Sequence, residues 1–366
     1  MVRRGWIVAF VLAALMVPSL TRAQQSDAAS DLPHANAWQA LKERRYGAAF
    51  DLFDAASASE PADASLQFGA GVAQLMRGRN SEASARFEAA LALDPELSDA
   101  SILLGQARYR QGDVAKAVDV YAEALAHAPA HPDLVDPLAR WRQELTADQA
   151  LLTLEGPHFG IRFHAGDDEL AADVLTVAEA AHARVGDILS ASTTRRIAIV
   201  LYTPQEFAAV TRLPDWAAGL YDGRIKLPLG GRTGVTRDDL ARLLDHEVVH
   251  AIVAATAGPT VPAWLNEGLA TALEPGGIAW AASFEATPGT RAFPPAARSF
   301  RALMPPDARL AYAQSTRAVQ QLLDRHGPDR MGALLRAMGE GLPLAVAFQD
   351  AFGETFDEID APAPAR

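Results

Sequence analysis

Two short stretches decide the fold of the second half of this chain: His-Glu-Val-Val-His at residues 246–250 and Trp-Leu-Asn-Glu-Gly-Leu-Ala at residues 264–270. On an α-helix, residues four positions apart lie one above the other on the same face. His246 and His250 can therefore bind one metal ion together. Glu247, between them, is then placed to accept a proton from a water held by that metal. The spacing predicts a Zn2+ site with two histidine ligands and a glutamate general base.

The residues around the first motif predict one long, largely buried helix. Thr236 is a suitable N-cap, two aspartates follow in the first turn, and Gly258-Pro259 ends the helix. Apolar residues recur at helical spacing, namely Leu240, Leu243, Leu244, Ala251, Ile252 and Ala255. Burying two imidazoles and a carboxylate without a partner is costly. This setting argues against a chance pair of exposed histidines.

The second motif supplies a third candidate ligand. Pro262 is suited to the start of a short helix and Pro275 ends it, so Glu267 lies about one and a half turns inside. If this helix folds back across the first, Glu267 completes a His2Glu set with one position open for water. Asp245 and Glu274 are the competing carboxylates, and we expect them to support the ligands or to face solvent.

Composition limits the function classes. The chain has 366 residues, of which 49% are hydrophobic, which is enough for two domains with well-filled cores. It has no cysteine, which excludes disulfides and thiolate metal sites. The formal net charge of −12 argues against a basic nucleic-acid surface, so we expect no nucleic-acid partner.

The N-terminal residues predict a signal peptide over residues 1–23. Arg3 and Arg4 precede the apolar run 6–17, and Thr-Arg-Ala at 21–23 offers a cleavage point. Twelve apolar residues are too few for a comfortable membrane span, although an uncleaved anchor is the alternative. No later segment reaches spanning length. We expect a periplasmic or secreted protein with no membrane span in the mature chain, and a bacterial periplasm suits the absence of disulfides.

A 34-residue period runs through the first half of the chain. Small residues allow helices to pack closely, aromatic residues fill the space between them, and a proline ends each second helix. Six sets of residues recur at this 34-residue spacing. They are Pro61, Pro95 and Pro129; Phe53, Phe87 and Tyr121; Ala49, Ala83 and Ala117; Ala56, Ala90 and Ala124; Gly71 and Gly105; and Gly78 and Gly112.

This pattern resembles the tetratricopeptide repeat, with about three units and a capping helix over residues 30–150. The first unit departs from it, because Ala37 stands where Gly71 and Gly105 follow. The resemblance implies a concave surface for a protein or peptide partner. The alternative is a spacer or a domain that only supports the second half.

Strand and helix patterns then alternate from residue 152 onward. The segments that carry them are a half-buried strand at 159–163, a helix at 167–189, a buried strand at 197–202 and a hairpin at 220–227 with a tight turn at Asp222-Gly223. In the hairpin, Ile225 and Leu227 should face the core, and Arg224 and Lys226 should face outward. These elements predict an α+β domain over residues 152–355, with a disordered tail at 356–366.

Residues 246–250 and 264–270, supported by Gly-Leu-Tyr-Asp-Gly-Arg-Ile at 219–225, resemble the gluzincin metallopeptidases, especially their compact bacterial peptidase-MA-like branch. The resemblance covers about residues 155–355. It implies an all-α N-terminal tetratricopeptide-repeat solenoid followed by an α+β gluzincin-like metallopeptidase domain. It also implies one Zn2+ per chain, a sheet edge along the cleft that can pair with an extended peptide, and hydrolysis of peptide bonds.

Two departures from the family bear on substrate class. Glu267 lies 17 positions after His250, which is closer than in the best-known branches, and the chain lacks a Gly-Ala-Met-Glu-Asn element that captures a free amine. The missing element weakens an aminopeptidase assignment, so an endopeptidase acting on protein or peptide substrates is the better expectation. Gluzincins often supply a tyrosine to the developing oxyanion, for which Tyr312 is the candidate and Tyr221 a rival. Segment 275–306 is either a lid or an irregular arm.

Two other classes of function remain open. One is a periplasmic interaction or scaffold protein, in which the repeats bind partners and the metal domain is structural or inactive. The other is a zinc amidase acting on cell-wall peptide. A structural zinc site has no use for a base at Glu247, which favours the peptidase.

Overall fold

The computed structural model describes residues 33–127, 131–193, 195–213, 217–284, 300 and 305–355. The expected signal peptide (1–23) and tail (356–366) lie outside the described residues, and so do residues 285–299 and 301–304 of the segment 275–306 for which a lid or an arm was considered. Among the helices described, none combines the length and the apolar character that crossing a bilayer requires.

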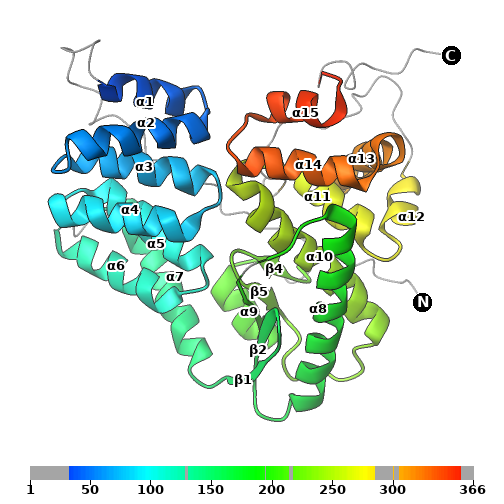
Figure 1. The fold of residues 1–366 in the computed structure, drawn as a ribbon. Coiled ribbons are helices and arrows are strands. Elements are labelled where there is room, and N and C mark those ends of the chain that lie inside the picture. The colour runs from blue at the N-terminus through cyan, green and yellow to red at the C-terminus, as the bar shows by residue number, and fades with distance from the viewer. Residues whose placement is uncertain are drawn as a thin grey trace.

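The first half is a stack of antiparallel helices that ends at residue 148 (Figure 1). The expected close packing is confirmed, since a Cβ on Gly71 would lie 2.6 Å from the Phe87 ring and one on Gly105 2.2 Å from the Tyr121 ring. The helices are α1 (Pro33–Lys42), α2 (Tyr46–Ser59), α3 (Ala64–Met76), α4 (Asn80–Leu93), α5 (Ser98–Arg110), α6 (Val114–His127) and α7 (Pro132–Asp148).

The second half begins with β1 and contains a five-stranded mixed sheet in the order β1-β2-β3-β5-β4. The two outer pairs are antiparallel, and β2, β3 and β5 run parallel. The strands and the helices among them are β1 (Leu152–Glu155), β2 (Phe159–Phe163), α8 (Asp168–Leu189), β3 (Ile197–Leu201), α9 (Pro204–Thr211), β4 (Leu220–Tyr221) and β5 (Ile225–Leu227). The remaining elements are α10 (Arg237–Ala257), the 3-10 turn Gly258–Thr260, α11 (Ala263–Leu273), α12 (Gly277–Ala282), α13 (Pro305–His326), α14 (Pro328–Gly339) and α15 (Leu344–Phe352).

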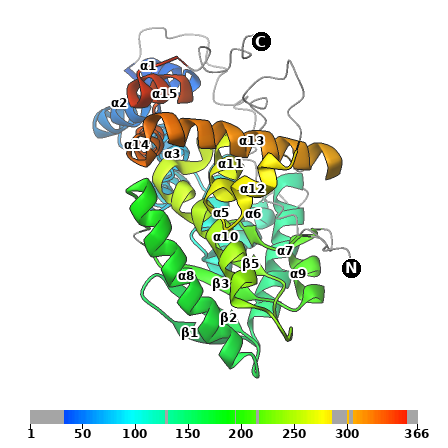
Figure 2. The same cartoon turned by 90° about the vertical axis from the view of Figure 1, so that its right-hand side faces the viewer.

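Side chains alternate between the two faces of the sheet along each strand, and each face packs against a different layer of helices. Ile161, Ile199 and Ile225 belong to the main core, together with the apolar faces of α8 and α10. Val200 and Tyr202 belong to a smaller cluster on the other face that includes α9. Helices α8 and α10 lie side by side, and α13 crosses over α11 (Figure 2). The sheet thus serves as the base on which α10 is held.

The repeat half docks on the second half through the turns within its repeats. Arg44, Gly78 and Gly112 lie 34 residues apart and all have left-handed φ angles, of 59°, 75° and 78°. Next to the first turn, the Tyr46 N–H donates to the Gly341 carbonyl at 3.3 Å. A Cβ on Gly78 would lie 2.6 Å from Gly258 Cα, and one on Gly112 would lie 3.5 Å from Arg224 Cγ. One edge of the solenoid is therefore covered.

The prediction that Arg224 and Lys226 face solvent is wrong, since they are only 3% and 1% exposed. The hairpin itself forms as expected, with Tyr221 opposite Ile225 and Gly223 in the turn at a φ of 111°. The face away from the sheet core is covered by α5 and α7 rather than by water. Strand alternation identifies two faces but does not reveal which of them a second domain covers.

These two cationic side chains form ion pairs with carboxylates of α7 and of the hairpin. Arg224 pairs with Asp148 at 2.6 Å and with Glu144, and Lys226 pairs with Glu144 at 2.9 Å and with Asp222 at 2.8 Å. We call this set of five residues the interdomain charge cluster. Because each charge has an opposite partner, the burial of all five is tolerated.

Tyrosines and one more arginine complete the hydrogen bonding of the cluster. The Tyr109 hydroxyl, from α5, lies 2.8 Å from both Glu144 Oε2 and Asp222 Oδ2. Tyr202 donates to Asp148 at 2.7 Å, and Arg162 donates to Asp148 at 3.1 Å. Elements β2, β3 and the β4–β5 hairpin are therefore all joined to the repeat half through a few buried side chains.

Arg224→Met should lower the free energy of unfolding by about 3–5 kcal/mol, because it leaves two buried carboxylates short of their cation. Calorimetric and urea unfolding measure the loss. Arg237→Met, which breaks an exposed 3.4 Å pair with Asp173, is the control and should stay within about 1 kcal/mol. Equal effects in the two variants would contradict a structural role for the cluster.

The cluster also predicts how stability depends on pH. Burial raises the pKa of Glu144, but Lys226 and Arg224 outweigh it and hold the pKa at about 2, below the ordinary 4.5. A carboxyl whose pKa is lower in the folded state contributes stability above its unfolded value. That stability, on the order of 3 kcal/mol, should be lost as the pH falls from about 4.5 toward 2. Unfolding of wild type and Glu144→Gln across this range measures it, and parallel curves would refute the prediction.

Candidate metal centre

Helix α10 carries the first three site residues because its start and its apolar face are well determined. Thr236 and Asp239 form a reciprocal capping box at the N-terminus, and the helix ends at Ala257, next to the expected Gly258-Pro259. His246, Glu247 and His250 are 1%, 0% and 2% exposed. Their side chains therefore lie inside the second half, in the layer between the sheet and α11.

Helix α11 brings the third candidate ligand, the carboxylate of Glu267, to the two histidines. The Glu267 Oε2 atom lies 3.8 Å from His246 Nε2 and 3.7 Å from His250 Nε2, and Glu267 is 4% exposed. One ligand atom from each of the three residues lies within 4.8 Å of the others. Bonds of about 2.1 Å to a tetrahedral zinc place ligand atoms about 3.4 Å apart, which is close to the two distances from Glu267 to the histidines.

His246 is oriented by Glu274, which follows α11. Glu274 Oε2 lies 2.6 Å from His246 Nδ1, so a proton on Nδ1 leaves Nε2 to face Glu267. Metal-binding histidines usually have such a partner on the second ring nitrogen. Asp245, the other competing carboxylate, instead forms an ion pair with Arg184 at 2.6 Å. Neither of these two carboxylates belongs to the converging set.

The two remaining ligands are also supported from neighbouring positions. Asn266 acts on the pKa of His250 in the direction opposite to burial, and the Tyr312 side chain hydrogen-bonds to Glu267. Tyr312 reaches Glu267 because α13 crosses α11 closely at Gly268, where a Cβ would lie 2.5 Å from the Ser315 carbonyl oxygen. Tyr312 thus lies at the ligand set rather than on a remote packing face.

Glu247 lies in a tight space that a glycine leaves open. A Cβ on Gly219, just before the edge strand β4, would lie 2.3 Å from Glu247 Oε1. Both Glu247 oxygens are buried and have no hydrogen-bond partner among the described residues. Such a carboxylate is costly to bury unless it meets a ligand or water. The rival tyrosine, Tyr221 on β4, lines a small cavity together with His250 and Asn266.

Burial shifts the pKa values of the whole group toward the neutral forms. It lowers the pKa of His246 to about 3 and, with His246 nearby, that of His250 well below its usual range. It raises the pKa of Glu274 to about 8 and those of Glu247 and Glu267 well above their ordinary values, with the Glu267 charge adding to the shift of Glu247. Neutral imidazoles are the form that binds metal.

The donor set fits zinc. Two imidazole nitrogens and one carboxylate oxygen converge, and Glu267 Oε2 has no hydrogen-bond partner among the described residues. Three protein ligands leave a fourth tetrahedral position for water or substrate, as in catalytic rather than structural zinc sites. A divalent cation would also favour the ionised forms of the carboxylates that burial disfavours.

A groove of about 220 Å³ lies beside this centre. Its lining runs from Ala218, next to Gly219, to Glu274, the partner of His246. Leu229, Leu240 and Leu243 supply apolar surface between them. The groove is thus close to β4, which forms one edge of the sheet.

Sequence reasoning named five candidate residues and left Glu274 and Asp245 open between supporting the ligands and facing solvent, but it did not pair any support with a particular ligand. Asn266 could have been noticed because it precedes Glu267 on the same helix. No local signal pairs Glu274 with His246 or places Gly219 against Glu247, since both contacts join segments 28 positions apart in the chain.

Comparison with known proteins bears on the repeat half. A tetratricopeptide repeat family model matches residues 34–83 and 77–132, so the chain contains these repeats. Among solved structures, the second tetratricopeptide domain of the human RPAP3 protein, in complex with an HSP70 peptide, matches with 24% identity and a TM-score of 0.29. That match covers 30% of this chain and 92% of the other. No curated protein matches the chain.

Glu274→Gln should weaken zinc binding by about 10- to 100-fold, because His246 loses the charged acceptor that orients its ring. Competition with a chelator measures the affinity. Asp245→Asn is the matched control, since it alters a neighbouring buried acid that pairs with Arg184, and should leave the affinity unchanged. Equal loss in both variants would show that general charge near the site, not the orienting bond, matters.

Proposed function

We propose that this protein is a zinc-dependent peptidase, most suited to internal peptide bonds, with His246, His250 and Glu267 as ligands. The observation that supports it best is the convergence of the three ligand atoms beside a buried Glu247 whose two oxygens have no partner among the described residues. A purely structural zinc site needs no such carboxylate, which argues against the scaffold alternative.

The residues around the site fit the steps of peptide hydrolysis. Zinc, when bound, supplies a Lewis acid that polarises the carbonyl and makes water a better nucleophile. Glu247 accepts the proton of the attacking water and passes it to the leaving amine. Tyr312, which bonds to Glu267, and Tyr221, beside His250, are the hydroxyls near enough to be considered as donors to the oxyanion.

The edge of the sheet supports an extended peptide as substrate. Strand β4 is hydrogen-bonded to β5 on one side only, and Gly219 brings its start against Glu247. A peptide that pairs with this edge would pass the general base, and its side chains could enter the groove between Ala218 and Glu274. We propose no specificity beyond an extended backbone.

The repeat half is proposed to bind a protein partner or the substrate itself. The matched tetratricopeptide repeats support this role. The edge formed by the turns at Arg44, Gly78 and Gly112 packs against the second half, so a partner would use another surface of the solenoid. Export to the periplasm or beyond, with cleavage after residue 23, is part of the same proposal and follows from the sequence alone.

Glu247→Gln should keep about one zinc per chain and lower the rate of cleavage of an unstructured protein by about 10²- to 10⁴-fold, because only the base is removed. Metal analysis and a cleavage assay on the same preparations measure both. His250→Ala should lose the metal as well as the cleavage. Cleavage that survives in the zinc-loaded Glu247→Gln protein would overturn the proposal.

A further inference from the structure

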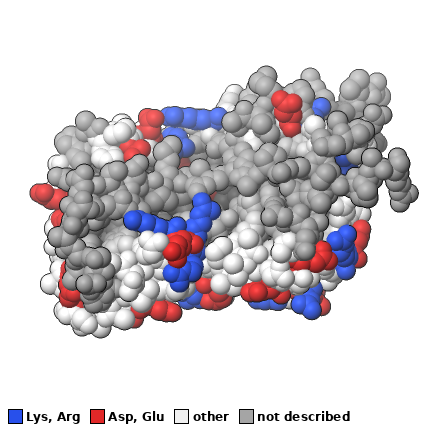
Figure 3. Space-filling model, turned by 90° about the horizontal axis from the view of Figure 1, so that it is seen from above, with Lys and Arg blue, Asp and Glu red and all other residues white. Residues whose placement is uncertain are grey.

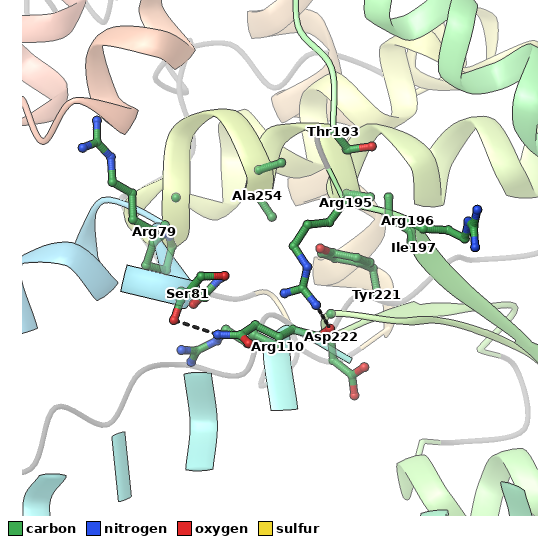
Figure 4. A pocket seen from close by; sticks show the side chains of 18 of the residues that line it. Arg79, Ser81, Arg110, Thr193, Arg195, Arg196, Ile197, Tyr221, Asp222 and Ala254 are labelled. Carbon is green, nitrogen blue, oxygen red and sulfur yellow. Dashed lines mark hydrogen bonds between the residues drawn. The ribbon is translucent and has the colours of Figure 1, made fainter. Parts of the chain in front are cut away.

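A cavity of about 300 Å³ lies between the repeat half and the second half, apart from the metal ligands (Figure 4). Arg79 and Arg110 reach it from the repeat helices, and Arg195 and Arg196 from the segment that precedes β3. The hairpin closes one side with Tyr221. The chain carries a net charge of −12, so four arginines around one cavity are unusual for it.

This gathering contrasts with the outer surface. On the described part of the face in Figure 3, Lys and Arg side chains are interspersed with Asp and Glu. At the cavity, two of the four arginines are already matched, Arg79 by Glu340 at 3.0 Å and Arg196 by Glu155 at 2.6 Å. Arg110 and Arg195 form no ion pair with any described residue. Arg195 only donates to the Gln111 carbonyl, at 3.0 Å.

Of these two arginines, Arg110 has the greater need of an additional hydrogen-bond acceptor. Its Nη1 atom is buried and has no hydrogen-bond partner among the described residues. Burial lowers the pKa of Arg110 to about 10, although Tyr121, Tyr221 and Asp222 act in the opposite direction. A buried guanidinium nitrogen without an acceptor is costly. Arg110 also lines the cavity, so an oxyanion there supplies an opposite charge beside it.

The acidic residues that line the cavity do not fill this role. Asp222 forms an ion pair with Lys226 at 2.8 Å and accepts a hydrogen bond from Tyr109 at 2.8 Å. Glu82 is exposed, so water screens its charge. The charge balance at the centre of the cavity therefore remains positive.

We propose that this interdomain cavity binds a small molecule through an oxyanion group, a carboxylate or a phosphate, held by Arg110 and Arg195. The guanidinium group suits both anions because its donors match their paired oxygens. A ligand there would touch α5 on one side and Tyr221 of β4 on the other, and would therefore join the repeat half to the hairpin beside the metal centre. Tyr221 borders both this cavity and the metal centre, but binding here does not depend on the proposed peptidase function.

Calorimetric titration of the zinc-loaded, full-length protein with inorganic phosphate and, separately, with citrate tests the proposal at constant ionic strength. Either anion can also bind the open zinc position, so the expected result is saturable binding of at least one probe that Arg195→Gln weakens. The tighter of the two Arg195-dependent affinities identifies the oxyanion. Arg110→Gln and Arg195→Gln should each weaken it by about ten-fold or more, because each removes a charge-assisted contact.

Arg196→Gln is the matched control, since Arg196 is adjacent to Arg195, exposed and already paired with Glu155, and its affinity should equal that of wild type. Arg195 is also exposed, so Arg195→Gln should fold even if Arg110→Gln does not. The proposal is overturned if neither probe binds saturably, or if Arg195→Gln and Arg196→Gln bind alike.

Discussion

The interdomain charge cluster fixes the part of the structure on which the candidate site depends. Arg224 and Lys226 leave the hairpin on the side opposite to the sheet core and end on Glu144 and Asp148 of α7. The same hairpin contains β4, and Gly219 at its start lies against Glu247. The space available to the proposed general base is therefore set partly by the repeat half, through one short hairpin with ion pairs behind it.

Buried ion pairs contribute little net stability, but they penalise any arrangement in which a charge loses its partner. Apolar surfaces would allow the two halves to slide, whereas the cluster has one arrangement that satisfies Arg224, Lys226 and their three carboxylates. The turns at Arg44, Gly78 and Gly112 add contacts along the same edge, because a 34-residue period repeats the same turn at regular intervals. The 34-residue spacing of the turns and the buried ion pairs together determine how the two halves pack against each other.

Features with a local period could be predicted from the sequence. The 34-residue columns, the capping of α10 by Thr236 and the spacing of His246 and His250 each involve residues that one element or one repeat brings together. The outward placement of Arg224 was wrong because alternation distinguishes two faces without showing what covers them. Glu274 meets His246, and Arg110 meets the interdomain cavity, through segments distant in the chain, which no local period encodes.

The docking has a mechanical consequence for the proposed function. A protein bound near the end of the solenoid could change its curvature by moving α5 or α7 relative to their neighbours. Tyr109 of α5 and Glu144 of α7 both hold the hairpin, so such a movement must either carry β4 along or separate buried charges. Separating the buried charges costs several kcal/mol. Movement of β4 would change the space around Glu247, because Gly219 at the start of that strand lies against it.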